Sequence, residues 1–142
     1  MSISRKKILL AAAFIVLLAA LFAYNAYGQR LGNLVKPIME SAFNSYTEVT
    51  NNPYADLIPD EYYNRMIQRR HLDFTLPDAH DRYKLSAPNV RWWPGGAVVT
   101  ITYSYEYYVG ESLESGSWNV PVEFTLEQQN GQWKIVNYYE AP

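Results

Sequence analysis

The stretch AVVTITYSYEY, residues 97–107, decides the fold of this chain. Every second side chain in it is aliphatic or aromatic, and most of those between are polar. Side chains of a strand point alternately to opposite faces of the sheet, so the pattern predicts a strand with one buried face. The expected inward residues are Val99, Ile101, Tyr103, Tyr105 and Tyr107.

Two later segments repeat this alternation and extend the predicted sheet. Their expected inward residues are Trp118, Val120, Val122, Phe124 and Leu126 in the first, and Trp133, Ile135, Asn137 and Tyr139 in the second. A sheet with one apolar face needs a cover, and we expect the residues before it to supply that cover.

The dipeptide Asn130-Gly131 predicts a tight hairpin between the last two strands, because a type I′ turn needs positive φ at both central residues. A two-residue loop sets four pairs opposite each other: Gln129 and Gln132, Glu127 and Lys134, Leu126 and Ile135, and Phe124 and Asn137. Opposite charges then meet on one face and large apolar side chains on the other. A slip of one residue would lose both matches.

The composition indicates one acidic domain that follows a basic N-terminal segment. The chain has 142 residues, 49% of them hydrophobic, with 13 Tyr and no Cys. The lack of Cys excludes disulfides, thiolate zinc sites and cysteine nucleophiles. Beyond residue 28 there are nine basic and 14 acidic residues, a poor electrostatic match for nucleic acid, so no nucleic-acid partner is predicted. No phosphate loop, dinucleotide fingerprint or Gly-x-Ser-x-Gly motif is present, and no cofactor is predicted.

Residues 1–28 form the predicted targeting or membrane-anchoring segment of the protein. Arg5, Lys6 and Lys7 precede a run of apolar residues that, with the tyrosines at its end, covers residues 8–27. About 17–25 such residues cross a bilayer, and a basic lead keeps the N-terminus in the cytoplasm. We therefore expect a single-pass anchor in the cell membrane, with residues 29–142 as an extracytoplasmic domain. The alternative is a signal peptide cleaved after Gly28, which would make the domain a secreted one.

Two helices are expected to cover the sheet. A polar-to-apolar lead, residues 29–36, precedes Pro37, which suits the first turn of a helix that ends before residues 50–53. The apolar stripe of this helix is Val35, Ile38, Met39, Ala42, Phe43, Tyr46 and Val49. Pro59 opens the second helix, which has Arg69 and Arg70 in its last turn.

A loop over residues 71–81 and one or two strands over residues 83–93 complete the expected elements. The inward candidates of these strands are Tyr83, Leu85, Val90 and Trp92. The loop holds His71, Asp73, Asp78, His80 and Asp81. None of them has the spacing of a helical His motif, so no metal site is predicted.

Helices followed by antiparallel strands predict an α+β fold, with N-terminal helices packed on a curved sheet. The closing residues 127–138, with a polar turn followed by Gly131-Gln-Trp-Lys-Ile135, resemble the final hairpin of the nuclear transport factor 2-like superfamily. The resemblance covers residues 34–139 and implies a cone-shaped sheet, as in ketosteroid isomerases. A cystatin-like sheet over a single helix is the competing fold.

The resemblance implies two kinds of function. The superfamily contains isomerases, dehydratases and polyketide cyclases. It also contains non-catalytic domains that follow a single membrane anchor, such as scaffold domains of bacterial secretion and conjugation machines. A fold alone does not choose between these functions.

The predicted inward face carries no Asp, Glu, His or Lys, whereas an isomerase needs an acid–base group there. Asp56, Asp73 and His71 are the candidate bases outside that face. The tyrosine column has two interpretations: it lines a pocket for an apolar ligand or peptide, or it fills a wide core. The candidate ligand-binding residues are Tyr103, Tyr105, Tyr107, Trp118, Phe124 and Asn137.

We therefore expect a non-catalytic binding or scaffold domain tethered to the membrane, whose partner is a protein or a small apolar ligand. The alternative is a small enzyme of the isomerase or dehydratase type. A third possibility is a structural domain that assembles through its sheet. A carboxylate inside the cone, close to a tyrosine hydroxyl, would favour the enzyme.

Overall fold

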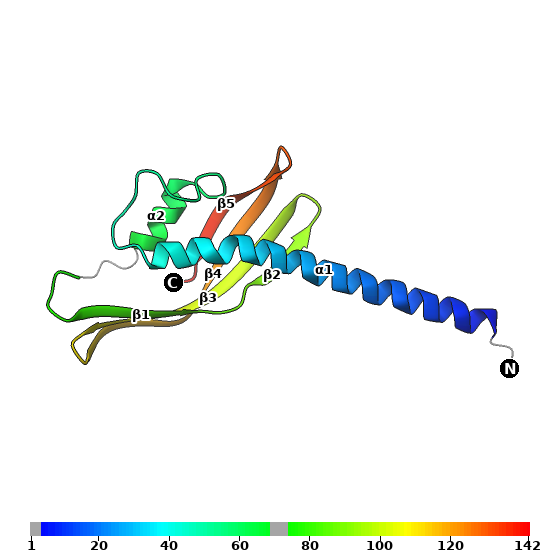
Figure 1. Ribbon diagram of the computed structural model, residues 1–142, viewed down its shortest axis with the longest axis horizontal. Coiled ribbons are helices and arrows are strands. Elements are labelled where there is room, and N and C mark those ends of the chain that lie inside the picture. Colours follow the sequence, from blue (N-terminus) through cyan, green and yellow to red (C-terminus); the bar gives the residue numbers. More distant parts are fainter. Residues whose placement is uncertain (1–3, 69–73) are drawn as a thin grey trace.

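The computed structural model describes residues 4–68 and 74–142, and these form the predicted α+β fold (Figure 1). Two helices come first and five strands follow. Their bounds are α1 Arg5–Phe43, α2 Asp60–Gln68, β1 Ala79–Leu85, β2 Asn89–Trp93, β3 Gly96–Val109, β4 Ser112–Gln129 and β5 Gln132–Glu140.

The strands form one antiparallel sheet in the order β1-β3-β4-β5. β2 also pairs with β3, so that β1 and β2 lie along the same edge of that long strand. β3 and β4 form a long hairpin that extends away from α1 together with β1 (Figure 1). The one or two strands predicted over residues 83–93 are two, β1 and β2, and their inward candidates Tyr83, Leu85, Val90 and Trp92 pack against the core.

The inner face of β3 and β4 is the core of the domain. Val99, Ile101, Val122 and Phe124 are all fully buried there, as their alternation predicts. The C-terminal half of α1 covers this face with its own buried residues, which are Leu31, Val35, Ile38, Met39, Ala42 and Phe43. Each large apolar side chain buried in this way stabilises the fold by about 1.5–3 kcal/mol.

α1 is one continuous helix, and the expectation of a separate lead and a helix opening at Pro37 is wrong. Pro37 lies inside the helix with its ring exposed. A proline inside a helix removes one backbone hydrogen bond, at a cost of about 3 kcal/mol. Burial of the helix face on both sides of Pro37 offsets this cost, so packing overrides the local signal.

α1 also ends earlier than its apolar stripe predicts, at Phe43 rather than near Val49. Tyr46 is 58% exposed, and residues 44–59 form an irregular connection to α2. The Asn64 side chain holds this connection, because its amide donates to the Val49 carbonyl and its oxygen accepts from the Val49 N–H. A side chain of α2 therefore supplies hydrogen bonds that a longer α1 would have made within itself.

α2 begins one residue after Pro59, as predicted, whereas Arg69 and Arg70 lie outside the described residues. The predicted loop over residues 71–81 is too long, since β1 already begins at Ala79. His80 and Asp81 are strand residues that pair with Tyr108 and Tyr107. Backbone pairing with β3 is the non-local contact that turns this polar segment into a strand.

The β4–β5 register is confirmed only next to its turn. Gln129 pairs with Gln132, Glu127 with Lys134, and Leu126 with Ile135. A bulge between Thr125 and Leu126 then shifts the register. Phe124 therefore lies opposite Tyr138, not Asn137, and Asn137 is exposed on the other face.

A second bulge, between Tyr103 and Tyr105, corrects the expected orientation of Trp118. Asn119 takes a φ of 54° in this bulge, and the Trp118 side chain, 54% exposed, lies on the outer face. Asparagine tolerates positive φ, and Pro121 two residues later is a residue that strands accept mainly at edges and bulges. These two residues were the signal for the bulge in the sequence.

The β4–β5 turn generates a stability prediction. Gly131 has a φ of 78°, which a β-branched residue resists. We expect Gly131→Val to lower the free energy of unfolding by about 1 kcal/mol or more, measured by urea denaturation. Gly131→Asn is the matched control and should cost less, because Asn tolerates positive φ. Equal urea midpoints for Gly131→Val and the parent chain would contradict the type I′ turn.

Candidate functional site

The inward tyrosines of β3 are packed by aromatic rings from outside the sheet. Tyr103, Tyr105 and Tyr107 are 8%, 6% and 5% exposed. The Phe43 ring, at the end of α1, lies edge-on to Tyr103 with 5.1 Å between ring centroids. Phe74 meets Tyr107 in the same way at 5.4 Å. Side chains therefore occupy the space above the column, as in the core interpretation of these residues.

The hydroxyls of Tyr105 and Tyr103 in this column contact carboxylates. Tyr105 Oη donates to Asp81 Oδ2 at 3.0 Å, and Tyr46 Oη donates to Asp81 Oδ1 at 3.1 Å. Near the last strand, Tyr103 donates to Glu140, and Tyr138 donates to the same carboxylate at 2.5 Å.

The expectation of an inward face without carboxylates is therefore wrong. Glu140 is only 8% exposed and lies among the core tyrosines. The bulge near Thr125 turns Tyr138 and Glu140 inward, and it turns Asn137 and Tyr139 outward. No residue of the segment marks this bulge, so alternation alone placed Glu140 on the wrong face.

The six predicted ligand-binding residues do not form one site. Tyr103, Tyr105, Tyr107 and Phe124 belong to the buried core. Trp118 and Asn137 lie on the outer side of the sheet, exposed to solvent.

Trp118 instead belongs to a polar cluster on the outer face, centred on Glu106. This carboxylate accepts hydrogen bonds from Tyr108 Oη at 2.9 Å, from Trp118 Nε1 at 3.3 Å and from Arg82 at 3.1 Å. Arg82 also donates to Tyr108 Oη at 2.5 Å, and its guanidinium lies 4.7 Å from the centroid of that ring. The His80 ring in β1 stacks on the ring of Tyr108, its partner in β3, with 5.3 Å between centroids.

These contacts shift two pKa values in opposite directions. Hydrogen bonds from Tyr108 and Trp118, together with the charge of Arg82, lower the pKa of Glu106. The hydrogen bond to Tyr108 and the Glu106 charge raise the pKa of Arg82. Both groups are therefore charged over the whole neutral range, and the cluster is a fixed ion pair on the outer face.

Of the three candidate bases, the structure describes Asp56, which is not brought together with the tyrosines. Asp56 is exposed, and its backbone carbonyl accepts a hydrogen bond from the Lys134 ammonium. His71 and Asp73 lie outside the described residues. Among the residues that the structure describes, no three His, Asp or Glu side chains converge as metal ligands.

The contact between α1 and β2 is a feature that the sequence analysis missed. A Cβ at Gly32 would lie 2.7 Å from Pro88 Cβ, and one at Gly28 would lie 3.6 Å from Val90 Cβ. Four residues of a helix rise about 6 Å, and two residues of a strand rise about 6.6 Å. Every fourth residue of α1 therefore meets every second residue of β2. The Gly28-x-x-x-Gly32 spacing in the sequence was the available signal for this close approach.

Toward the N-terminal end of α1, aromatic side chains make the contact between α1 and β2. Tyr24 stacks on Trp92 with 4.9 Å between centroids, and its carbonyl accepts from Trp92 Nε1 at 3.0 Å. Tyr27 packs on the same indole at 4.5 Å, and its hydroxyl accepts from Trp133 Nε1 at 3.0 Å. We call Tyr24, Tyr27, Trp92 and Trp133 the aromatic collar.

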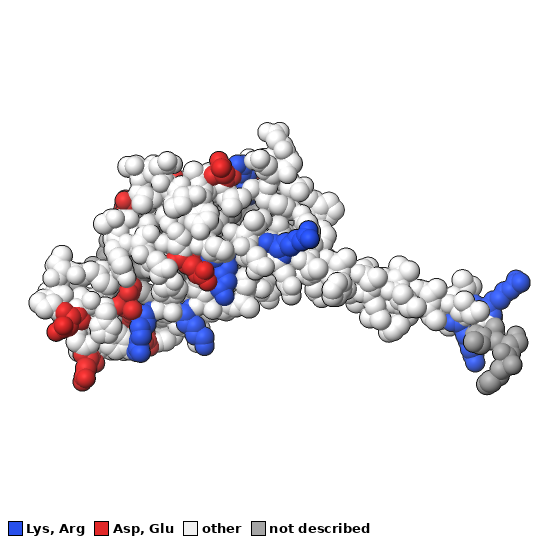
Figure 2. All heavy atoms as spheres, in the orientation of Figure 1, with Lys and Arg blue, Asp and Glu red and all other residues white. Residues whose placement is uncertain are grey.

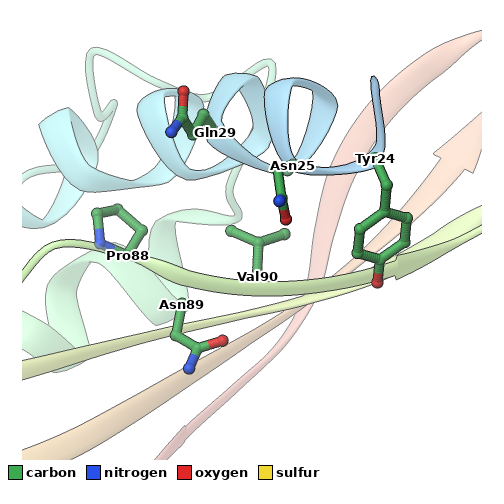
Figure 3. Close-up of a pocket in the computed structure, with 7 residues that line it drawn as sticks. Tyr24, Asn25, Gln29, Pro88, Asn89 and Val90 are labelled. Carbon is green, nitrogen blue, oxygen red and sulfur yellow. The ribbon is translucent and has the colours of Figure 1, made fainter. Parts of the chain in front are cut away.

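A groove of about 390 Å³ lies beside the collar, between α1 and β2. Figure 3 shows Asn25 pointing from α1 toward Val90, with Tyr24 at one end of the groove and Pro88 toward the other. The polar side chains of its lining are the amides of Asn25, Gln29 and Asn89 and the Tyr24 hydroxyl. The groove offers hydrogen-bonding groups without a charged side chain in its lining.

The N-terminal half of α1 is long and apolar enough to span a membrane. No residue of its most apolar window is buried, and large side chains such as Leu10, Phe14 and Phe22 are exposed. Figure 2 shows this projecting part without charged side chains until the basic cluster near its N-terminal end.

Comparison with known proteins adds little to these observations. No protein-family model matches the chain, and no curated protein matches it. A protein from Catenulispora acidiphila, solved at 2.5 Å, aligns over 87% of this chain and 92% of its own, with 13% identity and a TM-score of 0.40.

The Glu106 cluster generates a pH prediction. Tyr108→Phe removes the hydrogen bond that contributes most to the low pKa of Glu106, so we expect this pKa to rise toward its ordinary value. Because the folded-state pKa is depressed, the stabilisation by Glu106 is present above the unfolded pKa and is lost as pH falls through the folded one. Carboxyl ¹³C NMR titration of Glu106 in both proteins measures the change. An identical titration midpoint would show that Tyr108 does not act on this carboxylate.

Proposed function

We propose that this protein is a membrane-tethered extracytoplasmic domain that binds or scaffolds rather than catalyses. One observation carries the proposal: α1 is a single helix whose N-terminal half is exposed and apolar and whose C-terminal half is core. The domain is built directly on the helix that would anchor it, without an intervening linker. Such a tether fixes both the height and the orientation of the domain, which suits a scaffold.

The aromatic collar supports an anchor over a cleaved signal peptide. Cleavage after Gly28 would remove Tyr24 and Tyr27, which pack on Trp92 and bond to Trp92 and Trp133. Both indoles would lose hydrogen-bond acceptors, and each lost bond costs about 0.5–1.5 kcal/mol. The folded domain thus uses residues that a signal peptidase would discard. The basic lead at residues 5–7 supports an extracytoplasmic position for the domain.

The packing of the interior supports binding at the surface. Phe43 and Phe74 cover the tyrosine column, and the hydroxyls of Tyr103, Tyr105 and Tyr138 already contact carboxylates. Trp118, by contrast, is exposed and held in place by Glu106. Exposed aromatic residues of this kind are common in protein interfaces. The nuclear transport factor 2-like relationship is a further part of this proposal, and the order of the elements and the sequence of the final hairpin support it.

Cysteine labelling tests the topology, because the chain has no Cys of its own. In intact spheroplasts, Ser115→Cys in the β3–β4 hairpin should react with a membrane-impermeant maleimide. Ser4→Cys, ahead of the basic cluster, is the matched control and should react only after lysis. The reverse pattern would show the opposite orientation. Mature protein that begins at Gln29 in mass spectra would exclude the anchor.

The buried Glu140 favours a second candidate function, an isomerase or dehydratase. A carboxylate held by Tyr103 and Tyr138 has the groups that proton transfer needs. Under the main proposal we expect no turnover of isomerase or dehydratase substrates by the purified protein. Turnover that Glu140→Gln abolishes and the exposed Asp56→Asn leaves unchanged would replace the binding proposal with the enzyme.

A further inference from the structure

We propose that the domain rests on the membrane itself, with the β2–β3 turn and the aromatic collar in the lipid headgroup region. This inference rests on the proposed function, since it requires α1 to span the bilayer. It adds an interaction surface and its partner, which is the outer leaflet on the side of the domain.

The length of α1 places the domain at the surface of the bilayer. A helix crosses the hydrocarbon core, about 30 Å, with about 20 residues. Counted from Ile8, directly after the basic cluster, such a span ends near Tyr27. Domain contacts begin before that point, because Tyr24 stacks on Trp92 and bonds to the β2 backbone. The span and the domain therefore overlap by about one helical turn, and β2 ends at the level of the interface.

Tilting of α1 does not remove this overlap. A tilted helix needs more residues to cross the same thickness, so tilt moves the domain closer to the lipid. A flexible segment would allow the domain to rise, but α1 is helical without interruption from Arg5 to Phe43. The contact with the bilayer thus follows from the rigidity of the helix.

The side chains at this end of the domain suit the lipid headgroup region. Tyr and Trp concentrate at membrane–water interfaces, where their rings meet the acyl boundary and their polar atoms meet water. Trp93, beside the β2–β3 turn, is 49% exposed and Tyr24 is 40% exposed. The exposed Arg30 and Arg91 flank the collar in α1 and β2, and they are suited to lipid phosphates.

The two turns at this end carry few charges that would oppose the contact. The β2–β3 turn contains Pro94 and Gly95, and the Gly95 carbonyl accepts from the Gln128 N–H at 3.0 Å. This hydrogen bond joins the turn to the end of β4, so the β4–β5 hairpin lies beside it. Figure 1 shows both turns at the end of the sheet from which α1 leaves. The exposed acids Glu127 and Asp56 lie beside Lys134: Glu127 is its partner in the hairpin register, and the Asp56 carbonyl accepts from its ammonium.

The polar groove fits the same position. Three amide side chains belong to its lining, and Figure 3 shows Asn25 pointing toward Val90, whereas Gln29 and Asn89 point away from the space between α1 and β2. Amides are poorly suited to hydrocarbon but form hydrogen bonds with hydrated headgroups. Along α1, the exposed apolar segment is therefore followed by aromatic and amide side chains over residues 24–29, which is the order of polarity across an interface.

Fluorescence of the full chain in vesicles tests this proposal. We would label Pro94→Cys or Gln128→Cys with an environment-sensitive dye and reconstitute the protein in phosphatidylcholine and phosphatidylglycerol vesicles. Ser115→Cys, at the opposite end of the long hairpin, is the control. At positions 94 and 128, we expect emission at shorter wavelength and quenching by headgroup-nitroxide lipids. At position 115, we expect neither effect.

A spacer variant separates lipid contact from other causes of quenching. Seven polar helix-forming residues between Ala23 and Tyr24 lengthen α1 by about 10 Å outside the domain contacts. Quenching at position 94 should then fall to the level of position 115 while the protein still floats with the vesicles.

Flotation and resistance to carbonate extraction distinguish the two proposals. Protein that floats but shows equal, low quenching at positions 94, 128 and 115 overturns the membrane contact alone. Persistent quenching in the spacer variant overturns it as well. Protein that does not float overturns the membrane tether and the lipid contact together.

Discussion

The close approach of α1 to β2 is the contact on which the rest of the structure depends. Gly28 and Gly32 lack a Cβ where one would meet Val90 and Pro88, so the helix backbone lies directly on the strand. The near equality of the two repeats, about 6 Å for four helical and about 6.6 Å for two strand residues, keeps them aligned. This alignment sets α1 along the sheet and so brings Phe43 onto the tyrosines of β3.

The continuity of α1 places the exposed apolar segment and the core-covering segment in a single element. In many tethered proteins a flexible segment separates the membrane span from the domain, and the domain is then free to reorient. Here the helix that covers the core continues into the apolar segment without interruption. The aromatic collar adds hydrogen bonds between that helix and the sheet at the place where the two parts meet. Any motion of the domain relative to the apolar segment must therefore bend α1.

Two bulges decide which chemistry lies inside and which lies outside. One follows Tyr103 and places Trp118 beside Glu106 on the outer face. The other follows Thr125 and brings Glu140 to Tyr103 and Tyr138 in the interior. A bulge adds one residue to a strand and so reverses the face of every residue beyond it. Simple alternation would place Trp118 inside and Glu140 outside. The bulges reverse both, so that Trp118 is exposed and Glu140 is buried.

The sequence by itself determined the α+β class, the inner faces of β3 and of β4 from Val122 to Leu126, the β4–β5 turn and the apolar helix. These features depend on local signals: the period of two, the Asn-Gly dipeptide and an apolar run of sufficient length. Only the tertiary structure decided the passage of α1 through Pro37, the pairing of His80 and Asp81 with β3, and the burial of Glu140. Each of these depends on packing or pairing with residues distant in the chain, and such contacts can outweigh a local preference by a few kcal/mol.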